Sequence, residues 1–236
     1  MAMPGRPVAV VGAMSRELAP LLRASRHRQA GGVELFELGT AVVAIGGVGR
    51  NAARRAVEVL IVEYSPRLIV SAGVAGALSP KLRVGDVVCA REVVDADSGL
   101  HFATSGGEGV VVTVSAVSGP EAKRMLAQRW KADVVDMEAA AVGAAAQASG
   151  IEFAAIKAIS DELDFVLPPL GKFVDGEGKF HTLGFVAYVA LRPRWWKAVR
   201  QLNVNTRVAA AHLGDALSHL TDQELSPIDG EKTVGT

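Results

Sequence analysis

Residues 134–164, VVDMEAAAVGAAAQASGIEFAAIKAISDELD, carry the clearest structural signal in the chain. The alanine-rich segment in this stretch closes at Gly150, which is a typical C-terminal stop for a helix. The apolar run 153–159 that follows, interrupted by one lysine, is typical of a buried strand. Ligands of open α/β sheets bind at the carboxyl ends of strands. We therefore expect Glu138, in the first helical turn, and Asp161, just after the strand, to face one pocket.

The order of these motifs resembles a known family. DMEAAA, followed by an apolar strand and KAISD, resembles the paired signature of the purine nucleoside phosphorylase and nucleosidase superfamily, whose members cleave the bond between a purine and its ribose. The resemblance implies that Glu138 binds the ribose hydroxyls beside Met137, and that Asp161, preceded by Ser160 in the substrate site, protonates the leaving purine. Glycosidic cleavage builds opposite charges on sugar and leaving group, so an acid and oriented hydroxyls both lower the barrier. Taken alone, Asp161 is equally a helix N-cap and Glu138 a first-turn charge favoured by the helix dipole.

Length and composition predict one enzyme-sized domain. The chain has 236 residues, 50% of them hydrophobic, and we assign 1–220 to a single domain and the polar, aperiodic 221–236 to a flexible tail. Lys plus Arg equals Asp plus Glu at 25 each, which argues against a nucleic-acid partner. The lone Cys89 lies in an apolar run and is expected to be a buried small hydrophobe. The histidines show no metal-ligand spacing, so no metal is expected.

The chain begins with an apolar strand, PVAVVGAM at 7–14, which enters a strand-to-helix turn at Ser15. Glu17 in that turn is a favourable first-turn charge on structural grounds. GAM followed by an acidic stretch is also similar to the start of methylthioadenosine and adenosylhomocysteine nucleosidases, and this resemblance assigns Glu17 to the activation of water. Arg16 falls near the phosphate-contacting arginine of hexameric phosphorylases. The turn alone therefore does not decide whether water or phosphate accepts the ribosyl group when the glycosidic bond is cleaved.

A glycine-rich break, GGVGR at 46–50, precedes a helix predicted over 51–64. Its backbone amides, with Arg50, are suited to holding an anion, although Arg50 is equally well explained as a solvated first-turn residue. The segment lacks the lysine and hydroxyl of a P-loop and the spacing of a dinucleotide fingerprint. No cofactor is therefore expected, and phosphate is retained as an optional co-substrate.

SAGVAGALSPKLRVGDVV, at 71–88, resembles the central motif of the superfamily and places Gly73 and Val74 in the substrate site. Hexameric phosphorylases carry an arginine where Ser71 stands, and both classes usually have serine where Val74 stands. Lys157 occupies the place where nucleosidases generally carry arginine. A lysine there keeps the positive charge but cannot donate the two parallel hydrogen bonds with which an arginine holds an anion. The resemblance thus predicts a weakened anion site. Residues 95–109 read as a mobile loop, and the segment after the strand 110–115 lacks the aromatic that stacks on the purine in nucleosidases.

After Asp161 the chain departs from the nucleosidase pattern. The segment DELDFVLPPLGKFVDGEGKFHTLGFVAYVALRPRWWKAVRQL most resembles hopanoid-associated phosphorylases, which act on adenosylhopane. The structural alternative for this segment is two antiparallel helices, 181–191 and 195–219, that pack their apolar faces on the sheet. Trp195 and Trp196 stand among basic residues, an arrangement found at membrane surfaces and lipid-handling sites but also compatible with core packing or a subunit interface.

The sequence as a whole predicts a three-layer α/β/α sandwich around a mixed central sheet. The predicted activity is N-glycosidic cleavage of an adenine nucleoside with a 5′ substituent, adenosylhopane by the resemblance, through phosphorolysis or hydrolysis. The alternatives are a nucleosidase of small 5′-thioadenosines and, from another class, a nucleoside-binding protein without turnover. A homodimer is expected from the family. No signal peptide or membrane-spanning run is recognisable, so the predicted location is cytoplasmic, with peripheral contact at the inner face of the membrane.

Overall fold

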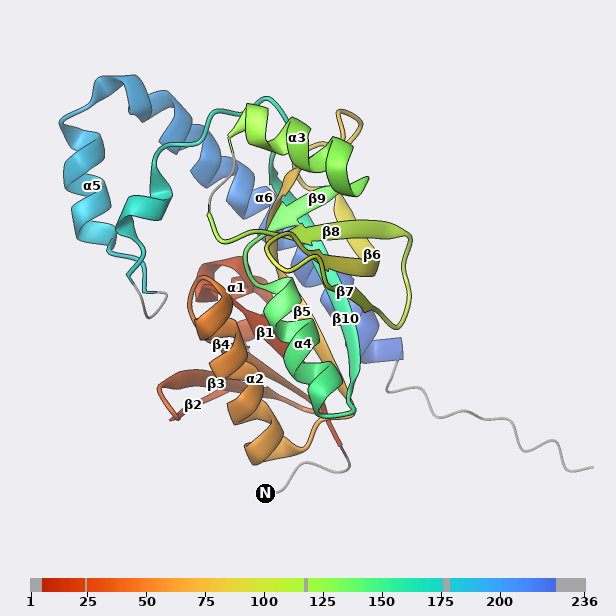
Figure 1. Ribbon diagram of the computed structural model, residues 1–236. Coiled ribbons are helices and arrows are strands. Elements are labelled where there is room, and N and C mark those ends of the chain that lie inside the picture. The colour runs from red at the N-terminus through yellow and green to blue at the C-terminus, as the bar shows by residue number, and fades with distance from the viewer. Residues whose placement is uncertain (1–5, 24, 117–118, 176–178, 224–236) are drawn as a thin grey trace, which may run out of the picture.

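The computed structural model describes residues 6–23, 25–116, 119–175 and 179–223. They form one mixed sheet of ten strands with helices on both faces (Figure 1), which confirms the three-layer fold predicted from the sequence. The strands are β1 Val8–Gly12, β2 Arg26–Ala30, β3 Val33–Leu38, β4 Ala41–Ile45, β5 Leu68–Ala77, β6 Val87–Asp95, β7 His101–Ala103, β8 Gly109–Thr113, β9 Val134–Asp136 and β10 Glu152–Asp161. The helices are η1 Ser15–Glu17, α1 Ala19–Leu22, α2 Arg50–Tyr64, α3 Pro120–Trp130, α4 Ala139–Ala148, η2 Leu170–Phe173, α5 Thr182–Ala190, η3 Pro193–Trp195 and α6 Trp196–Gln223.

The order of the strands brings the ends of β1, β5 and β10 together. The sheet runs β10-β6-β8-β9-β5-β1-β4-β3-β2, and β10 also pairs with β5, so the first five strands close into a ring. β1 and β10 both run parallel to β5. Their carboxyl ends therefore lie at the same edge of the sheet, where ligands of α/β folds bind.

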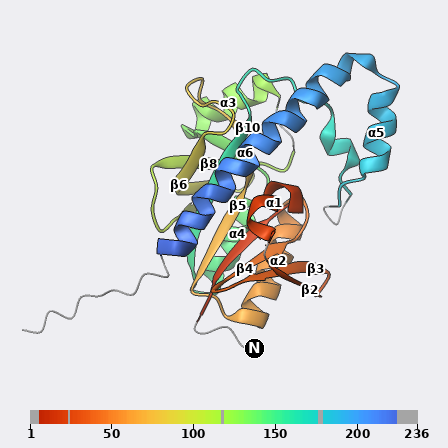
Figure 2. The ribbon, with the colours of Figure 1, turned by 180° about the vertical axis from the view of Figure 1, so that it is seen from behind.

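The helices cover the sheet as the strand sequences require. β1 and β4 are buried along their whole length, which is expected of strands covered on both faces. α2 and α4 pack on one face, and α6 crosses the other (Figures 1 and 2). α6 buries Ala209, Leu213 and Leu217 against the sheet, and their i, i+4 and i+8 spacing forms one helical stripe.

A β-bulge interrupts the pairing of β10 with β5 near its carboxyl end. Ile159 lies opposite Ala75, but Asp161 lies opposite Gly76, so the register shifts between Ile159 and Asp161. Bulges re-aim the side chains next to them and are common beside active sites. The irregularity falls at the motif that the sequence singled out as catalytic.

The start of α4 differs from the prediction. The helix begins at Ala139, so Glu138 is its N-cap residue and not a member of the first turn. The carboxylate that stabilises this helix start belongs to Asp136, whose Oδ2 accepts the Ala139 N–H at 2.9 Å. The structural alternative for Glu138 as a first-turn charge is therefore wrong.

Two further expectations are corrected around β6. Cys89 is exposed, because neighbouring Ala90 takes the buried face of the strand and successive side chains point to opposite faces. The segment 95–109 is not a loop throughout, since it contains β7, which pairs with the end of β6 and buries Phe102. Residues 224–236 of the predicted tail lie outside the described residues, whereas 221–223 belong to α6.

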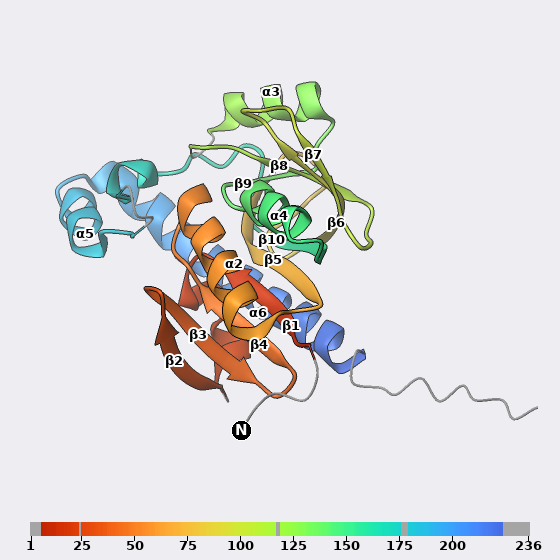
Figure 3. The same ribbon diagram turned by 60° about the horizontal axis from the view of Figure 1, so that its bottom comes forward.

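α5 does not pack on the sheet, and the structural alternative in which both C-terminal helices do so is wrong for this helix. It stands off the body of the molecule beside the start of α6 (Figure 3), and none of its residues is buried. Its aromatic contacts are local: Phe173 of η2 lies 5.4 Å, between ring centroids, from both Phe185 and Tyr188. Leu183 is 85% exposed and Trp196, at the start of α6, is 56% exposed. Core packing therefore does not explain Trp196.

Candidate active site

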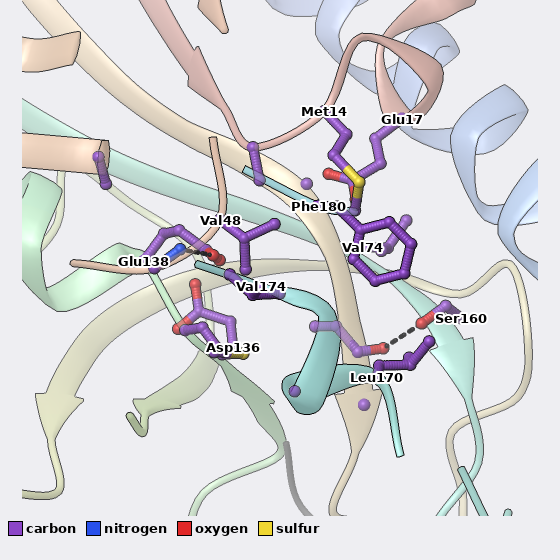
Figure 4. A pocket seen from close by; sticks show the side chains of 18 of the residues that line it. Met14, Glu17, Val48, Val74, Asp136, Glu138, Ser160, Leu170, Val174 and Phe180 are labelled. Atoms are coloured by element: carbon purple, nitrogen blue, oxygen red, sulfur yellow. Dashed lines mark hydrogen bonds between the residues drawn. The ribbon is translucent and has the colours of Figure 1, made fainter. Parts of the chain in front are cut away.

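A cavity of about 660 Å³ opens at the carboxyl ends of β1, β5 and β10. Its walls come from η1, from the loop before α2, from the N-terminus of α4, and from segments that follow β8 and β10. Figure 4 shows Glu17, Glu138 and Ser160 among the side chains that line it. Across the described ranges, no three His, Cys, Asp or Glu side chains come together in an arrangement suited to a metal ion.

Asp161 lies in this cavity with both carboxylate oxygens engaged. Ser160 Oγ donates a hydrogen bond to Asp161 Oδ1 at 2.7 Å. Lys123 of α3 donates to Asp161 Oδ2 at 2.5 Å, and the lysine side chain is 1% exposed. Sequence reasoning missed Lys123. The available signal was its spacing from Ala127 and Trp130, which places the lysine on the inward face of the helix.

Glu17 faces the same cavity from η1. It is 3% exposed, and burial raises the pKa of its carboxyl from 4.5 to about 7, with a further increase from the negative charge of Glu138. Its Oε2 lies 3.3 Å from the position that a Cβ on Gly73 would occupy, so a glycine on β5 makes room for it. A carboxyl group whose pKa lies near neutrality is well suited to general-base catalysis.

Glu138 is anchored by the glycine-rich loop before α2. Its Oε1 accepts the N–H of Gly49 at 2.7 Å (Figure 4). Burial, followed by the charge of Asp136, raises the pKa of Glu138 to about 7. Met137 lines the cavity beside it, and so do Gly73 and Val74 of β5. The cavity thus brings together the predicted catalytic and substrate-binding residues.

Lys157 is not in the cavity with them. Its ammonium lies 2.8 Å from Asp136 Oδ2 and donates to Ser71 Oγ at 3.0 Å, and its side chain is 2% exposed. Thr113 Oγ1 donates to the other oxygen of Asp136 at 2.6 Å. A buried ammonium requires a counter-charge and hydrogen-bond acceptors, and Asp136 and Ser71 supply them for Lys157. The structure therefore does not bring Lys157 together with the residues that line the cavity, and its role in an anion site stays a prediction.

The two arginines of the predicted anion site, Arg16 and Arg50, differ in how their charges are paired. Arg50 lines the cavity, but its guanidinium forms a bidentate pair with Asp95, with both N–O distances 2.7 Å, and contacts Asp97 at 3.1 Å. Hydrogen bonding to Asp95 raises the pKa of Arg50 and, in return, lowers that of Asp95 to about 2. Arg16 is exposed at the rim of the cavity. Arg16 and Arg50 thus both line the cavity, whereas Lys157 does not.

An apolar wall closes the side of the cavity formed by the chain after β10. Phe180 lies on this wall and pairs edge-on with Phe185 of α5, at 5.5 Å between ring centroids. Figure 4 shows Phe180 among the side chains that line the cavity, together with Met14 and Val74. Sequence analysis assigned it no role, since a single aromatic next to a glycine-rich turn has no periodic signal. The remaining apolar residues of the wall are Leu167, Leu170, Val174 and Leu202.

Comparisons with known proteins show which proteins this chain is similar to. The chain is 28% identical over 199 residues to the 5′-methylthioadenosine/S-adenosylhomocysteine nucleosidase of Actinobacillus succinogenes, an alignment that covers 66% of this chain and 86% of that protein. Among solved structures, the futalosine hydrolase of Helicobacter pylori has a TM-score of 0.71 at 18% identity, covering 92% of this chain and 98% of the hydrolase. The 5′-methylthioadenosine/S-adenosylhomocysteine nucleosidase of Colwellia psychrerythraea, in complex with adenine, also has a TM-score of 0.71 at 18% identity, covering 94% and 97%. At this identity the two structures establish the fold alone.

A model of the family described as the phosphorylase superfamily matches residues 7–107 and 100–178. The two matched ranges together contain most of the chain, including β1, β5, β10 and the acidic residues of the cavity. The chain therefore belongs to the phosphorylase superfamily and is an enzyme of the nucleoside phosphorylase and nucleosidase group that its sequence resembles.

Proposed function

We propose that this chain hydrolyses the N-glycosidic bond of an adenine nucleoside that carries a substituent at its 5′ position. The observation that carries the proposal is the meeting of Asp161, Glu17 and Glu138 in one cavity at the carboxyl ends of the strands. The names of the relatives, nucleosidases of 5′-substituted adenosines and a futalosine hydrolase, support the same reaction class.

Each acidic residue has a distinct role in this proposal. Glu138, held by the Gly49 amide, accepts hydrogen bonds from the ribose hydroxyls. Glu17 accepts a proton from the attacking water, and its raised pKa makes it a stronger base than an ordinary glutamate. Asp161 delivers a proton to the purine as the glycosidic electron pair moves onto the base. These steps use side chains and water alone.

Water is preferred to phosphate as the acceptor for an electrostatic reason. Glu17 and Glu138 flank the reaction space, and Asp136 lines the cavity beside Glu138. The neighbouring cations are compensated, because Arg50 pairs with Asp95 and Lys157 with Asp136. Arg16 at the rim is a further cation of the cavity wall, but a phosphate dianion placed between Glu17 and Glu138 would meet more negative charge than Arg16 compensates, which disfavours its binding.

The apolar wall formed by Phe180, Leu170, Val174 and their neighbours supports a purine and an apolar 5′ group as the substrate. Phe180 offers the aromatic surface for the base that the segment after β8 does not supply. The resemblance of the C-terminal segment to hopanoid-associated phosphorylases favours an adenosyl lipid. The relatives' names favour a small 5′-thioadenosine, and we keep it as the alternative substrate.

The test is release of free adenine from adenosine, methylthioadenosine and an adenosyl lipid, each with and without phosphate. We expect release in phosphate-free buffer and fastest turnover of the adenosyl lipid. Dependence on phosphate would replace hydrolysis with phosphorolysis. Fastest turnover of methylthioadenosine would select the small-substrate nucleosidase. Binding without release from any of the three would favour the nucleoside-binding protein.

We also propose that the region around α5 docks on an anionic membrane. Residues 179–214 contain six Lys or Arg residues and no Asp or Glu, although the whole chain is neutral. Leu183, Val186, Leu191 and Trp196 of this region are 85%, 56%, 80% and 56% exposed. Apolar side chains among basic ones are the composition of a membrane-surface segment. In the described part of the chain, no helix is both long and apolar enough to cross a bilayer.

Co-sedimentation with phosphatidylserine-containing and phosphatidylcholine-only vesicles tests this docking. We expect the wild type to bind the anionic vesicles at low salt and Leu191→Ala/Trp196→Ala to lose binding. Val62→Ala is the matched control, since Val62 is 80% exposed on α2. Absence of wild-type binding to anionic vesicles would reject membrane docking. Light scattering on the same variants measures the predicted homodimer, and a double variant that is monomeric when the wild type is dimeric would assign the surface to a second copy.

A further inference from the structure

Lys123 is a buried lysine of α3 that contacts Asp161, and the roles proposed for Asp161, Glu17 and Glu138 do not involve it. Its ammonium contacts Asp161 Oδ2 at 2.5 Å, the Asp161 carbonyl oxygen at 3.2 Å and the Glu162 carbonyl oxygen at 2.8 Å. An ammonium group has three N–H donors, so these contacts use all of them. Lys123 and Asp161 both line the cavity. The hydrogen bonds of Lys123 therefore fix its position relative to Asp161, and both side chains can reach a substrate bound in the cavity.

The strand opposite this pair leaves space for it. A Cβ at Gly76 of β5 would lie 2.9 Å from Lys123 Cε and 3.0 Å from Asp161 Oδ2, too close for a real side chain. The bulge in β10 is what pairs Asp161 with Gly76. The glycine, the bulge and the inward face of α3 together fix the contact between Lys123 and Asp161.

This contact raises a question about the source of the catalytic proton. In the proposed function, on which this inference rests, Asp161 must deliver a proton to the departing purine. An ammonium within hydrogen-bonding distance favours the ionised carboxylate, which has no proton to deliver. The pair does hold one transferable proton, on Lys123 Nζ. An ammonium group can transfer one of its protons to a carboxylate that it contacts, whereas a guanidinium in its place would keep its protons.

We propose that Lys123 is a positioning residue that orients Asp161 and supplies the proton that Asp161 delivers to the leaving purine. When the C–N bond breaks, its electron pair moves to the purine. The proton passes from Lys123 Nζ to Asp161 Oδ2 and then to the base, which leaves Asp161 ionised and Lys123 a neutral amine. Water adds to the ribose and gives its proton to Glu17. Solvent then returns a proton to Lys123 and removes one from Glu17.

Other charged groups surround the pair. Glu162 follows Asp161 in the chain, and the exposed Arg124 of α3 pairs with the exposed Asp164. Across the cavity, Glu17 and Glu138 are the acidic groups that face the substrate space. The ionisation of Glu17 affects every variant of Lys123 in the same way. The ratio of variant to wild-type kcat therefore removes its contribution from the pH profile.

Lys123→Met is the main test, since methionine is similar in length but carries neither charge nor proton. With the nucleoside that the wild type cleaves, kcat is expected to fall roughly 10²–10⁴-fold at about pH 8, with a much smaller change in KM. The loss should shrink as the pH falls, because the solvent then becomes an alternative source of the proton that the leaving purine needs. A residue with a purely structural role would lower kcat by the same factor at every pH.

Two further variants separate charge from proton supply. Lys123→Arg keeps the positive charge but does not release a proton, so it should fold and remain slow across the whole pH range. Lys123→Met/Asp161→Asn should be no slower than Asp161→Asn, because Lys123 acts through Asp161. If Lys123→Met does not fold by circular dichroism, Lys123→Arg still decides the question, because its kcat is compared directly with that of the wild type.

Lys157→Met is the matched control, because it also removes a buried lysine from its carboxylate, Asp136. Its kcat relative to the wild type should not recover at low pH. A pH-independent ratio for Lys123→Met, or wild-type kcat in Lys123→Arg, would overturn the inference while leaving the proposed function intact. A wild type that releases no adenine would reject both.

Discussion

The raised pKa of Glu17 predicts that Glu17→Gln gains stability as it loses activity. The carboxyl is 3% exposed, and its pKa rises from 4.5 to about 7 on folding, mainly through burial. Each tenfold change in ionisation corresponds to about 1.4 kcal/mol, so keeping Glu17 ionised in the folded chain costs about 3 kcal/mol. The folded chain favours the neutral acid, so the stability that Glu17 contributes is fully present below pH 4.5 and is lost as the pH rises through about 7.

Glutamine has the same shape and does not ionise, so Glu17→Gln should escape this loss. Urea denaturation followed by circular dichroism, from about pH 5 to about pH 8, measures the free energy of unfolding of both proteins. The variant should become more stable than the wild type by up to about 3 kcal/mol at the alkaline end, while kcat falls roughly 10²–10⁴-fold. Glu58→Gln is the control, since Glu58 has a side chain 60% exposed, and should change stability by less than about 0.5 kcal/mol. Parallel stability curves for Glu17→Gln and the wild type would refute the reasoning.

Three further substitutions test the other parts of the site. Asp161→Asn should keep nucleoside binding, measured by calorimetry, but lose roughly 10²–10⁴-fold in kcat, and near-wild-type turnover would remove Asp161 from the mechanism. Glu138→Gln should slow cleavage of ribosides far more than of 2′,3′-dideoxy analogues, which lack the hydroxyls it holds, whereas equal losses would assign Glu138 a structural role. Phe180→Ala should raise KM about tenfold through lost stacking on the base, and Phe173→Ala, which removes a neighbouring ring that does not line the cavity, should leave KM unchanged.

Much of this protein could be predicted from short stretches of its sequence. The apolar run 153–159 and the glycine-closed helix before it are local patterns, and each reports its own secondary structure. The rule that ligands bind at the carboxyl ends of strands then placed Asp161 and Glu138 in one pocket. These predictions needed no knowledge of which strands are neighbours. The predictions of the helix and the strand succeeded because each depends on residues that are adjacent in the chain.

The partners of the charged residues were decided by tertiary structure. Lys123 and Asp161 are 38 positions apart, and they meet because the ring of strands brings α3 against the end of β10. Lys157 and Arg50 were predicted to bind an anion, but each is satisfied by a carboxylate from a distant strand. Local sequence shows that a residue is charged. Whether its charge is available to a ligand depends on what folding places within a few ångströms of it.

The same reasoning explains α5. Its sequence is apolar enough to suggest a core helix, yet none of its residues is buried. Hydrophobicity sets a preference for burial, but the surface that satisfies it must be within reach. In this chain α6 already covers that face of the sheet with Ala209, Leu213 and Leu217, so α5 is left beside the cavity with its apolar side chains exposed. The sequence determined the helix, and the packing of the rest of the chain determined that it would face outward.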